Sequence, residues 1–319
     1  MSEPRTTTCP FCLNGCTSGV RFNGYRYEAY YPQEGRVNRG RLCPRGNSAS
    51  IVIDHHDRLC RPVLDGRDIT WQEAERLVRR WLAEVRPDEL VLVYGRGRSP
   101  QEVQLLHGLA RQIGTPNLVC GHIEPENSLA ARLEGVEIAT LEQVEKAQKV
   151  CLVGDVFSTS PVISSRILDS RYADRKNRLV VIDSVRTRQS GFAHHFLQVR
   201  PGAEPFVLIA LAALIDSKLL PEVRIDHLVQ LAGVDAAGLK AAAAAIGSRS
   251  QGFVGCALHF GRVRYPWLSG MCAQLVAVAA KQPFLGFAEA LLPAGTMQFS
   301  ALRKAISTGR IRMVFWTGG

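Results

Sequence analysis

Three cysteines lie within eight residues near the start of the chain, and a fourth follows after 26 intervening residues; they are Cys9, Cys12, Cys16 and Cys43. Cysteine thiolates hold iron–sulfur clusters, and a close triplet with one distant cysteine is typical of the four-iron type. The spacing predicts one [4Fe-4S] cluster within residues 1–60. A structural zinc site is the alternative, although it usually has two separated C-x2-C pairs and only one is present. Incidental, unliganded cysteines are the third possibility.

Arg45 stands two residues after the fourth cysteine, in the stretch Cys43-Pro44-Arg45-Gly46. A fixed positive charge beside a cluster raises its reduction potential and could connect it to a second cofactor. Arg45 is therefore a candidate cofactor-binding residue. The alternative is an ordinary surface cation.

The bulk composition describes a globular α/β protein. The chain has 319 residues, 46% hydrophobic and 21% charged, which suits two or three packed units. Nine cysteines is an odd number, which favours metal ligation in a reducing compartment over disulfides. The first residues have no apolar leader, and no window is apolar enough to span a membrane, so we expect a cytoplasmic protein.

The formal charge is +10, which admits an anionic partner or a basic solvated surface. We expect no nucleic-acid partner, because no basic stripe is interleaved with aromatic residues.

Short apolar runs alternate with helical patterns along the chain, which predicts parallel sheets with crossover helices. A capping box formed by Thr70 and Glu73 predicts a helix to about Leu82. The predicted strands are Leu90–Tyr94, Val150–Val153, Leu179–Ile182, Phe196–Val199, Gly252–Leu258 and Met313–Trp316. The other predicted helices are Pro100–Ile113, Pro161–Asp169, Glu204–Leu214, Ala236–Ile246 and Leu268–Ala280.

Several of these strands end in a glycine-containing turn, and Gly95 and Gly154 are the two main examples. Ligands of open α/β sheets bind beyond the carboxyl ends of strands, where glycine lets the backbone approach a phosphate. These turns predict a site for a large dinucleotide. Glycine in an ordinary tight turn is the alternative.

The cysteine motif and several later segments resemble the N-terminal third of molybdopterin- or tungstopterin-dependent oxidoreductases, such as formate dehydrogenases. The later segments are Arg58–Pro62, Ile69–Ala74, Val150–Gly154, Ser160-Pro161, Val181–Thr187 and Val199–Gly202. The short length and the stretch Gly252–Gly261 resemble most closely the B subunit of formylmethanofuran dehydrogenase and its relatives in bacterial formyltransferase/hydrolase complexes.

The resemblance implies a small iron–sulfur domain followed by two Rossmann-like parallel-sheet domains, without a C-terminal barrel domain. Residues 1–60 would be the cluster domain. Residues 61–121 and 246–319 would form one discontinuous pterin-binding-like domain, with 122–245 inserted. The family's barrel would come from another subunit of a hetero-oligomeric complex.

The resemblance also implies site residues. Cys120 falls where the family places its molybdenum- or tungsten-ligating residue, with His122 as the active-site histidine, although Gly121 separates the two. Asp183, Arg186 and Thr187 match an element that contacts the guanine dinucleotide of the pterin. Asp155 departs from the family pattern, because it places a negative charge where a pyrophosphate is expected. The alternative for Cys120 is a small core residue.

Two functions follow from the resemblance. In the first, the chain is a subunit of a one-carbon (formate/CO2 or formylmethanofuran) oxidoreductase, and its cluster relays electrons to a pterin-bound molybdenum or tungsten. In the second, it is a structural or electron-transfer subunit of a formyltransferase/hydrolase complex that has lost the pterin. An assembly module stabilised by its cluster is a third option.

Other reactive side chains are predicted to be structural. The pairs His55-His56 and His194-His195 are adjacent in sequence, and neighbours on an extended chain point to opposite faces. The remaining cysteines are predicted to pack in or beside the core; they are Cys60, Cys151, Cys256 and Cys272.

Overall fold

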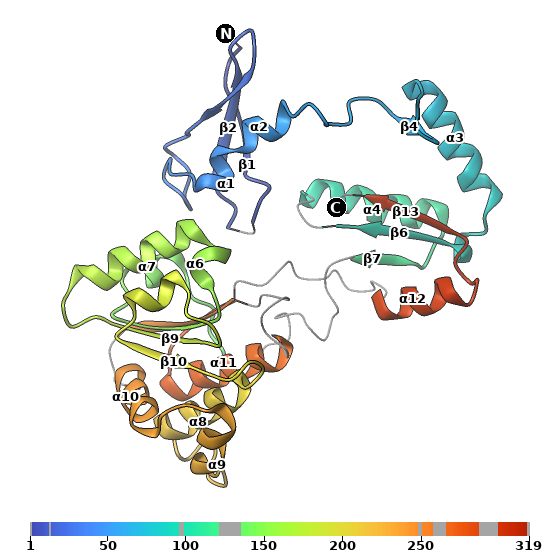
Figure 1. Cartoon of the computed structure of the whole chain (residues 1–319). Coiled ribbons are helices and arrows are strands. Elements are labelled where there is room, and N and C mark those ends of the chain that lie inside the picture. The colour runs from blue at the N-terminus through green and yellow to red at the C-terminus, as the bar shows by residue number, and fades with distance from the viewer. Residues whose placement is uncertain are drawn as a thin grey trace.

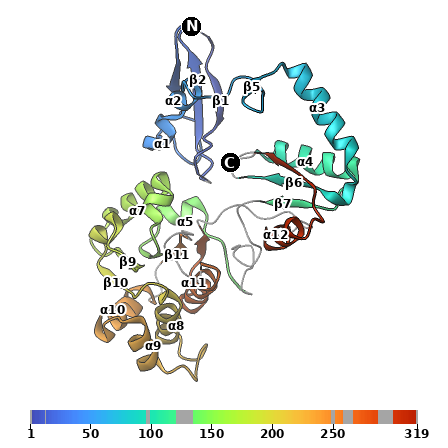
Figure 2. The same cartoon turned by 45° about the vertical axis from the view of Figure 1, so that its right-hand side comes forward.

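The computed structural model describes residues 2–12, 14–95, 99–120, 135–247, 251–257, 266–286 and 299–317. An N-terminal domain of short antiparallel strands is followed by two parallel α/β units, as Figures 1 and 2 show. The predicted α/β class with parallel sheets is confirmed.

The N-terminal domain is built on a three-stranded antiparallel sheet of β1 (Arg5–Thr8), β2 (Thr17–Phe22) and β3 (Tyr27–Tyr30). Two short helices follow, α1 (Pro44–Asn47) and α2 (Ala49–Ile53). The sequence did not reveal these strands, because β1 is exposed throughout and carries no alternation of apolar and polar residues.

The segment after α2 leads through a small hairpin into a long helix. Strands β4 (Val63–Leu64) and β5 (Arg67–Asp68) pair around Asp65 and Gly66, which both have positive φ, as tight hairpin turns require. Helix α3 (Trp71–Glu84) then begins at the predicted capping box.

Thr70→Ala tests this helix start. The Thr70 hydroxyl accepts from the Glu73 amide at 3.2 Å, and the Glu73 carboxylate accepts from the Thr70 amide at 2.8 Å. Losing the cap is expected to lower the free energy of unfolding by about 1 kcal/mol, measured by urea denaturation. Glu75→Ala is the control, since it removes only the exposed ion pair with Arg79 and costs less than about 0.5 kcal/mol. Equal losses in both variants would contradict the prediction.

The first α/β unit is a three-stranded parallel sheet in the order β13-β6-β7. Its strands are β6 (Leu90–Tyr94), β7 (Leu118–Cys120) and β13 (Met313–Thr317). Leu90 and Leu92 pack in a cluster that contains residues of α4 (Pro100–Ile113), whereas Val91 and Val93 pack with α12 (Phe299–Ser307). The helices therefore cover opposite faces, as Figure 1 shows.

The second unit is a five-stranded parallel sheet in the order β10-β9-β8-β11-β12. Its strands are β8 (Lys149–Val153), β9 (Arg178–Asp183), β10 (His195–Gln198), β11 (Gly252–Cys256) and β12 (Phe284–Gly286). One face packs against α8 (Glu204–Ile215), α10 (Ala236–Ile246) and α11 (Pro266–Ala280), with α9 (Ile225–Ala232) beside α8. The other face packs against α5 (Leu141–Glu145), α6 (Val156–Thr159) and α7 (Pro161–Ala173).

Strands β11 and β12 lie in the second sheet, which differs from the predicted division, where residues 246–319 belong with the first unit. Strand β11 pairs with β8 in parallel from Gly252↔Lys149 to Cys256↔Val153, and β12 pairs with β11. The chain contributes to the first sheet again only with β13. A fully buried apolar run such as β11 fits the centre of either sheet, so its sequence does not say which one it joins.

Within the described ranges, no single helix is long and apolar enough to cross a membrane. Helices α9 and α10, bent by 109° at their junction, meet that length and composition only as a pair.

Candidate functional site

The cysteine triplet lies on the loop between β1 and β2, and the fourth cysteine lies at the start of α1. The loop is closed by a hydrogen bond from the Cys9 amide to the Cys16 carbonyl at 2.8 Å. Cys43 is the extended N-cap residue of α1, whose first residue is Pro44. Cys9 and Cys16 are buried, whereas Cys12 and Cys43 are partly exposed.

Asn38 holds the segment that carries Cys43 against the loop that carries the triplet. Its side-chain oxygen accepts from the Thr17 amide at 2.8 Å, and its amide group donates to the carbonyls of Thr17 and Arg41 at 2.8 and 2.9 Å. Asn38 is only 2% exposed. The sequence analysis missed this residue, because a single asparagine carries no spacing signal.

Asn38→Ala is expected to lower the free energy of unfolding by about 2 kcal/mol, since it leaves the Thr17 amide without its acceptor. Urea denaturation measures this loss. Asn38→Asp is the graded control, because it keeps an acceptor for the Thr17 amide and loses both donated bonds. A loss below 0.5 kcal/mol for alanine, roughly that of a surface substitution, would show that Asn38 does not hold the two segments together.

The separation of the four sulfurs favours a cluster over a single zinc ion. Tetrahedral zinc with Zn–S bonds near 2.3 Å places its sulfurs about 3.8 Å apart. No three of these cysteine sulfurs, all in the described part of the chain, lie within 4.8 Å of one another. A multi-atom iron–sulfur cluster needs a ligand set that is spread more widely than one ion.

The thiols nevertheless lie within electrostatic reach of one another. Burial, and then Cys12, Cys9 and Cys43, raise the pKa of Cys16 to about 12. Burial is also the main cause of the raised pKa of Cys9, which the Phe11 amide and the Arg45 guanidinium oppose. A bound cationic metal would stabilise the thiolates of Cys9 and Cys16, whose pKa values burial raises, so these buried donors fit a metal cluster.

Arg45 connects the cysteine domain to the second α/β unit. Its guanidinium donates to the carbonyls of Ser158 and Thr159, at 2.8 and 3.2 Å, at the C-terminal end of α6. Cations are favourable at this end of a helix. Arg45 therefore connects the segment that carries Cys43 to α6. The contact of Arg45 with a cofactor stays a prediction.

Arg166 of α7 makes a second contact between the second α/β unit and the N-terminal domain, and here the α/β unit supplies the arginine. Its guanidinium donates to the carbonyls of Val37, at 3.0 Å from Nε, and of Arg36 at 3.2 Å, and it also pairs with Glu145. Val162 packs in one cluster with Cys9 and Cys16. The cysteine loop thus rests on α6 and α7 through both polar and apolar contacts.

The strand order of the second sheet reverses between β8 and β11, which is the position where open α/β sheets bind ligands. Gly154 follows β8 with φ of +73°, and a Cβ there would lie 2.5 Å from the Ala257 carbonyl that follows β11. Gln189 is fully buried and donates to the Gly154 carbonyl at 2.7 Å. Gly154 therefore allows the turn after β8 to lie close to the backbone after β11, in one of the glycine-containing turns that the sequence predicts.

The same turn does not fit a bound phosphate. Asp155 is the N-cap of α6, and its carboxylate accepts from the Ser158 amide at 3.1 Å. The carboxylate occupies the helix start where a phosphate would be bound, and it repels an anion. This turn therefore disfavours the pyrophosphate of a pterin dinucleotide.

The predicted residues of the next strand gather at the same edge. Asp183 ends β9, is buried, and accepts from the Val185 amide at 3.2 Å. Arg186 is exposed, with its guanidinium 5.1 Å from the ring centre of Phe196. The Thr187 hydroxyl is buried with no hydrogen-bond partner among the described residues. Their predicted contacts with a dinucleotide stay predictions.

Glu204 is a buried carboxyl at this edge that the sequence analysis assigned only to a helix. It is 2% exposed, and its Oε2 has no partner in the described part of the chain. Burial and the neighbouring Asp183 raise its pKa. The signal was available in the stretch Arg200-Pro201-Gly202-Ala203-Glu204, where an acid follows a turn at the end of a strand.

Glu204→Gln is expected to stabilise the protein at pH 8. A carboxyl whose pKa is raised on folding opposes folding once the pH rises through the folded-state pKa, and a neutral amide removes that cost. The gain in melting temperature should shrink as the pH is lowered, because the raised pKa lets the buried carboxyl take up its proton before an ordinary carboxyl does. Glu222→Gln, at an exposed position, is the control. A gain that is independent of pH would contradict the assignment.

Of the predicted catalytic residues, Cys120 belongs to the first sheet. Cys120 is the last residue of β7 and pairs in register with Tyr94, which precedes Gly95. Gly95 donates its amide to the Thr317 carbonyl at 2.8 Å. Gly95 and the Cys120 backbone therefore share the carboxyl edge of this sheet. His122 lies outside the described residues.

Comparison with known proteins relates the chain to the molybdopterin-type oxidoreductases, formate dehydrogenase among them. One relative is the F420-dependent formate dehydrogenase subunit alpha of Methanocaldococcus jannaschii, 24% identical over 221 residues, which cover 66% of this chain and 32% of the relative. A nitrate reductase of Klebsiella oxytoca is 27% identical over 223 residues, covering 66% and 26%. The chain thus spans about a third or less of the length of these relatives.

The fold also has a solved counterpart. Acetylene hydratase from Pelobacter acetylenicus superposes with a TM-score of 0.61 at 14% identity, covering 86% of this chain and 43% of that one. No protein-family model matches the chain.

Proposed function

We propose that the chain is the cluster-carrying part of a one-carbon (formate/CO2 or formylmethanofuran) oxidoreductase of the pterin type. The observation that carries the proposal is the four-cysteine set, spread more widely than a single-ion site and resting on α6 and α7. The relation to a formate dehydrogenase alpha subunit supports the substrate class. A [4Fe-4S] cluster held by Cys9, Cys12, Cys16 and Cys43 would supply electron transfer.

The roles of this chain's own residues follow from their contacts. Arg45 places a fixed charge between the thiols and α6, where it favours the reduced, more negative form of a cluster. In this proposal Cys120 is the ligand of molybdenum or tungsten, and His122 moves the accompanying proton. Relatives named as the alpha subunit of a formate dehydrogenase and as subunits of NADH-quinone oxidoreductases favour partner subunits.

A second candidate is a structural or electron-transfer subunit without the pterin. The observation in its favour is Asp155, whose carboxylate fills the helix start beside Gly154 and disfavours a pyrophosphate there. In that case the cluster serves a complex of the formyltransferase/hydrolase type, and the edge of the second sheet binds no dinucleotide.

Metal analysis of the native assembly, purified without oxygen, separates the two. About four irons per chain together with molybdenum or tungsten would support the first candidate. The same iron without either metal would support the second, and zinc alone would overturn both. Where molybdenum or tungsten is found, Cys120→Ala tests the ligand, because unchanged formate oxidation would remove Cys120 from that role.

A further inference from the structure

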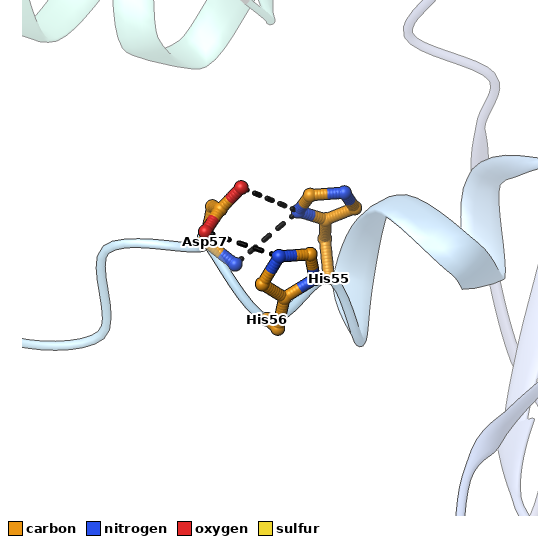
Figure 3. A group of neighbouring side chains, drawn as sticks. All are labelled: His55, His56 and Asp57. Carbon is orange, nitrogen blue, oxygen red and sulfur yellow. Dashed lines mark hydrogen bonds and ion pairs between the residues drawn. The ribbon is translucent and has the colours of Figure 1, made fainter.

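Two histidines and an aspartate meet where the chain leaves α2. His55, His56 and Asp57 offer three ligand atoms that all lie within 4.8 Å of one another, and no other such group of three occurs among the described residues. Figure 3 shows the carboxylate of Asp57 facing both imidazoles. Asp57 Oδ1 lies 3.2 Å from Nε2 of His56, and Oδ2 lies 3.9 Å from Nδ1 of His55.

These separations suit one transition-metal ion. Nitrogen and oxygen ligands about 2.0–2.1 Å from a tetrahedral ion lie about 3.4 Å apart, between the two measured separations. The imidazole rings stack with centres 4.6 Å apart, which keeps the two side chains together. The Asp57 amide donates to Nδ1 of His55 at 3.2 Å, and a metal bound there would replace this single exposed hydrogen bond.

The turn that carries the three residues is held in place independently of any metal. The carboxylate of Asp54, at the C-cap of α2, accepts from the Tyr27 amide of β3 at 2.8 Å. This bond fixes the end of α2 against the N-terminal sheet. The backbone next to the three ligands is therefore anchored, which reduces the entropy lost when a metal binds.

A depression of about 520 Å³ adjoins the cluster and is lined by both histidines together with Tyr27, Glu28, Ile51 and Asp54. It leaves room for a water molecule or an external donor at a fourth coordination position. Sites with three protein ligands and one open position are the usual form of zinc sites that bind a further group.

We propose that His55, His56 and Asp57 bind one divalent transition ion, with Zn²⁺ as the representative, and leave one position open toward this depression. Imidazole and carboxylate donors suit zinc, whereas the four thiols suit softer iron–sulfur chemistry. The proposed zinc site is thus separate from the cysteine site in its donors, and it does not depend on the proposed redox function.

Zn²⁺ titration of the tag-free full chain by calorimetry tests the proposal. The double variant His55→Ala/His56→Ala is expected to lose one equivalent of micromolar binding relative to the wild type. Because the cysteines are present in both proteins, their own zinc binding cancels in this difference. The control is His227→Ala, an exposed histidine elsewhere, which should keep the equivalent.

A single replacement, Asp57→Asn, is expected to weaken this equivalent at least about tenfold, since it removes the only charged ligand. The same stoichiometry and affinity in the wild type and the double variant would overturn the proposal. Binding that appears only at millimolar Zn²⁺ would also overturn it. Circular dichroism of each variant confirms that the fold is retained.

Discussion

Replacing Cys16 with serine is expected to abolish the iron content of the reconstituted protein, from about four irons per chain to below one. Cys16 is 5% exposed, and its thiol lies within electrostatic reach of the other three. Serine replaces a soft thiolate ligand with a hard hydroxyl, which suits iron–sulfur chemistry poorly. Iron and sulfide assays, with the visible absorbance, measure the loss after anaerobic reconstitution.

Two further variants make this prediction decisive. Cys12→Ser changes a partly exposed member of the set and should lose the cluster without a buried substitution. Cys60→Ser changes an exposed cysteine outside the set and should keep the full iron content. Four irons retained in both Cys12→Ser and Cys16→Ser would exclude this set as the cluster ligands.

Gly154→Ala is expected to lower the free energy of unfolding of the second unit by about 3 kcal/mol or more. The left-handed backbone costs an alanine about 1 kcal/mol or somewhat more. The new Cβ would also lie 2.5 Å from the Ala257 carbonyl, which cannot move without disturbing its neighbours, because the Ala257 amide donates to Val153 at 2.9 Å. Urea denaturation followed by tryptophan fluorescence and circular dichroism measures the change.

Gly66→Ala separates the two causes. Gly66 also has a positive φ, of +77°, but a Cβ there meets nothing within 4 Å. The Gly66→Ala variant should therefore lose only the stability that the left-handed backbone costs an alanine, about 1 kcal/mol. If both variants lose the same stability, the close approach of the turns after β8 and β11 makes no contribution.

The sequence predicted those features whose signal lies within one short segment of the chain. The runs Leu90–Tyr94 and Met313–Trp316 predict strands because each is apolar and of strand length, and both lie in strands of the structure. The helix start at Thr70 was recognised because a capping box is a contact between residues three apart. Such signals lie within one segment, so no knowledge of the tertiary structure is needed.

Features that depend on distant contacts were not predictable in the same way. The pairing of β11 with β8 joins segments about a hundred residues apart, and nothing in Gly252–Cys256 encodes the choice of partner. Asn38 acts on Thr17 across 21 residues, and the buried state of Glu204 follows from the packing around α8. Each depends on the tertiary structure, which amino-acid spacing does not report.

The contacts of Arg45 and Arg166 with the backbone have a consequence for how this protein can vary. Both guanidiniums donate to main-chain carbonyls, so the side chains of Ser158, Thr159 and Val37 do not take part in these hydrogen bonds. In a set of homologous sequences we therefore expect the contact with Arg45 to place no constraint on the side chains at positions 158 and 159. The two arginines should change rarely, and then only together with the length of the loops they reach.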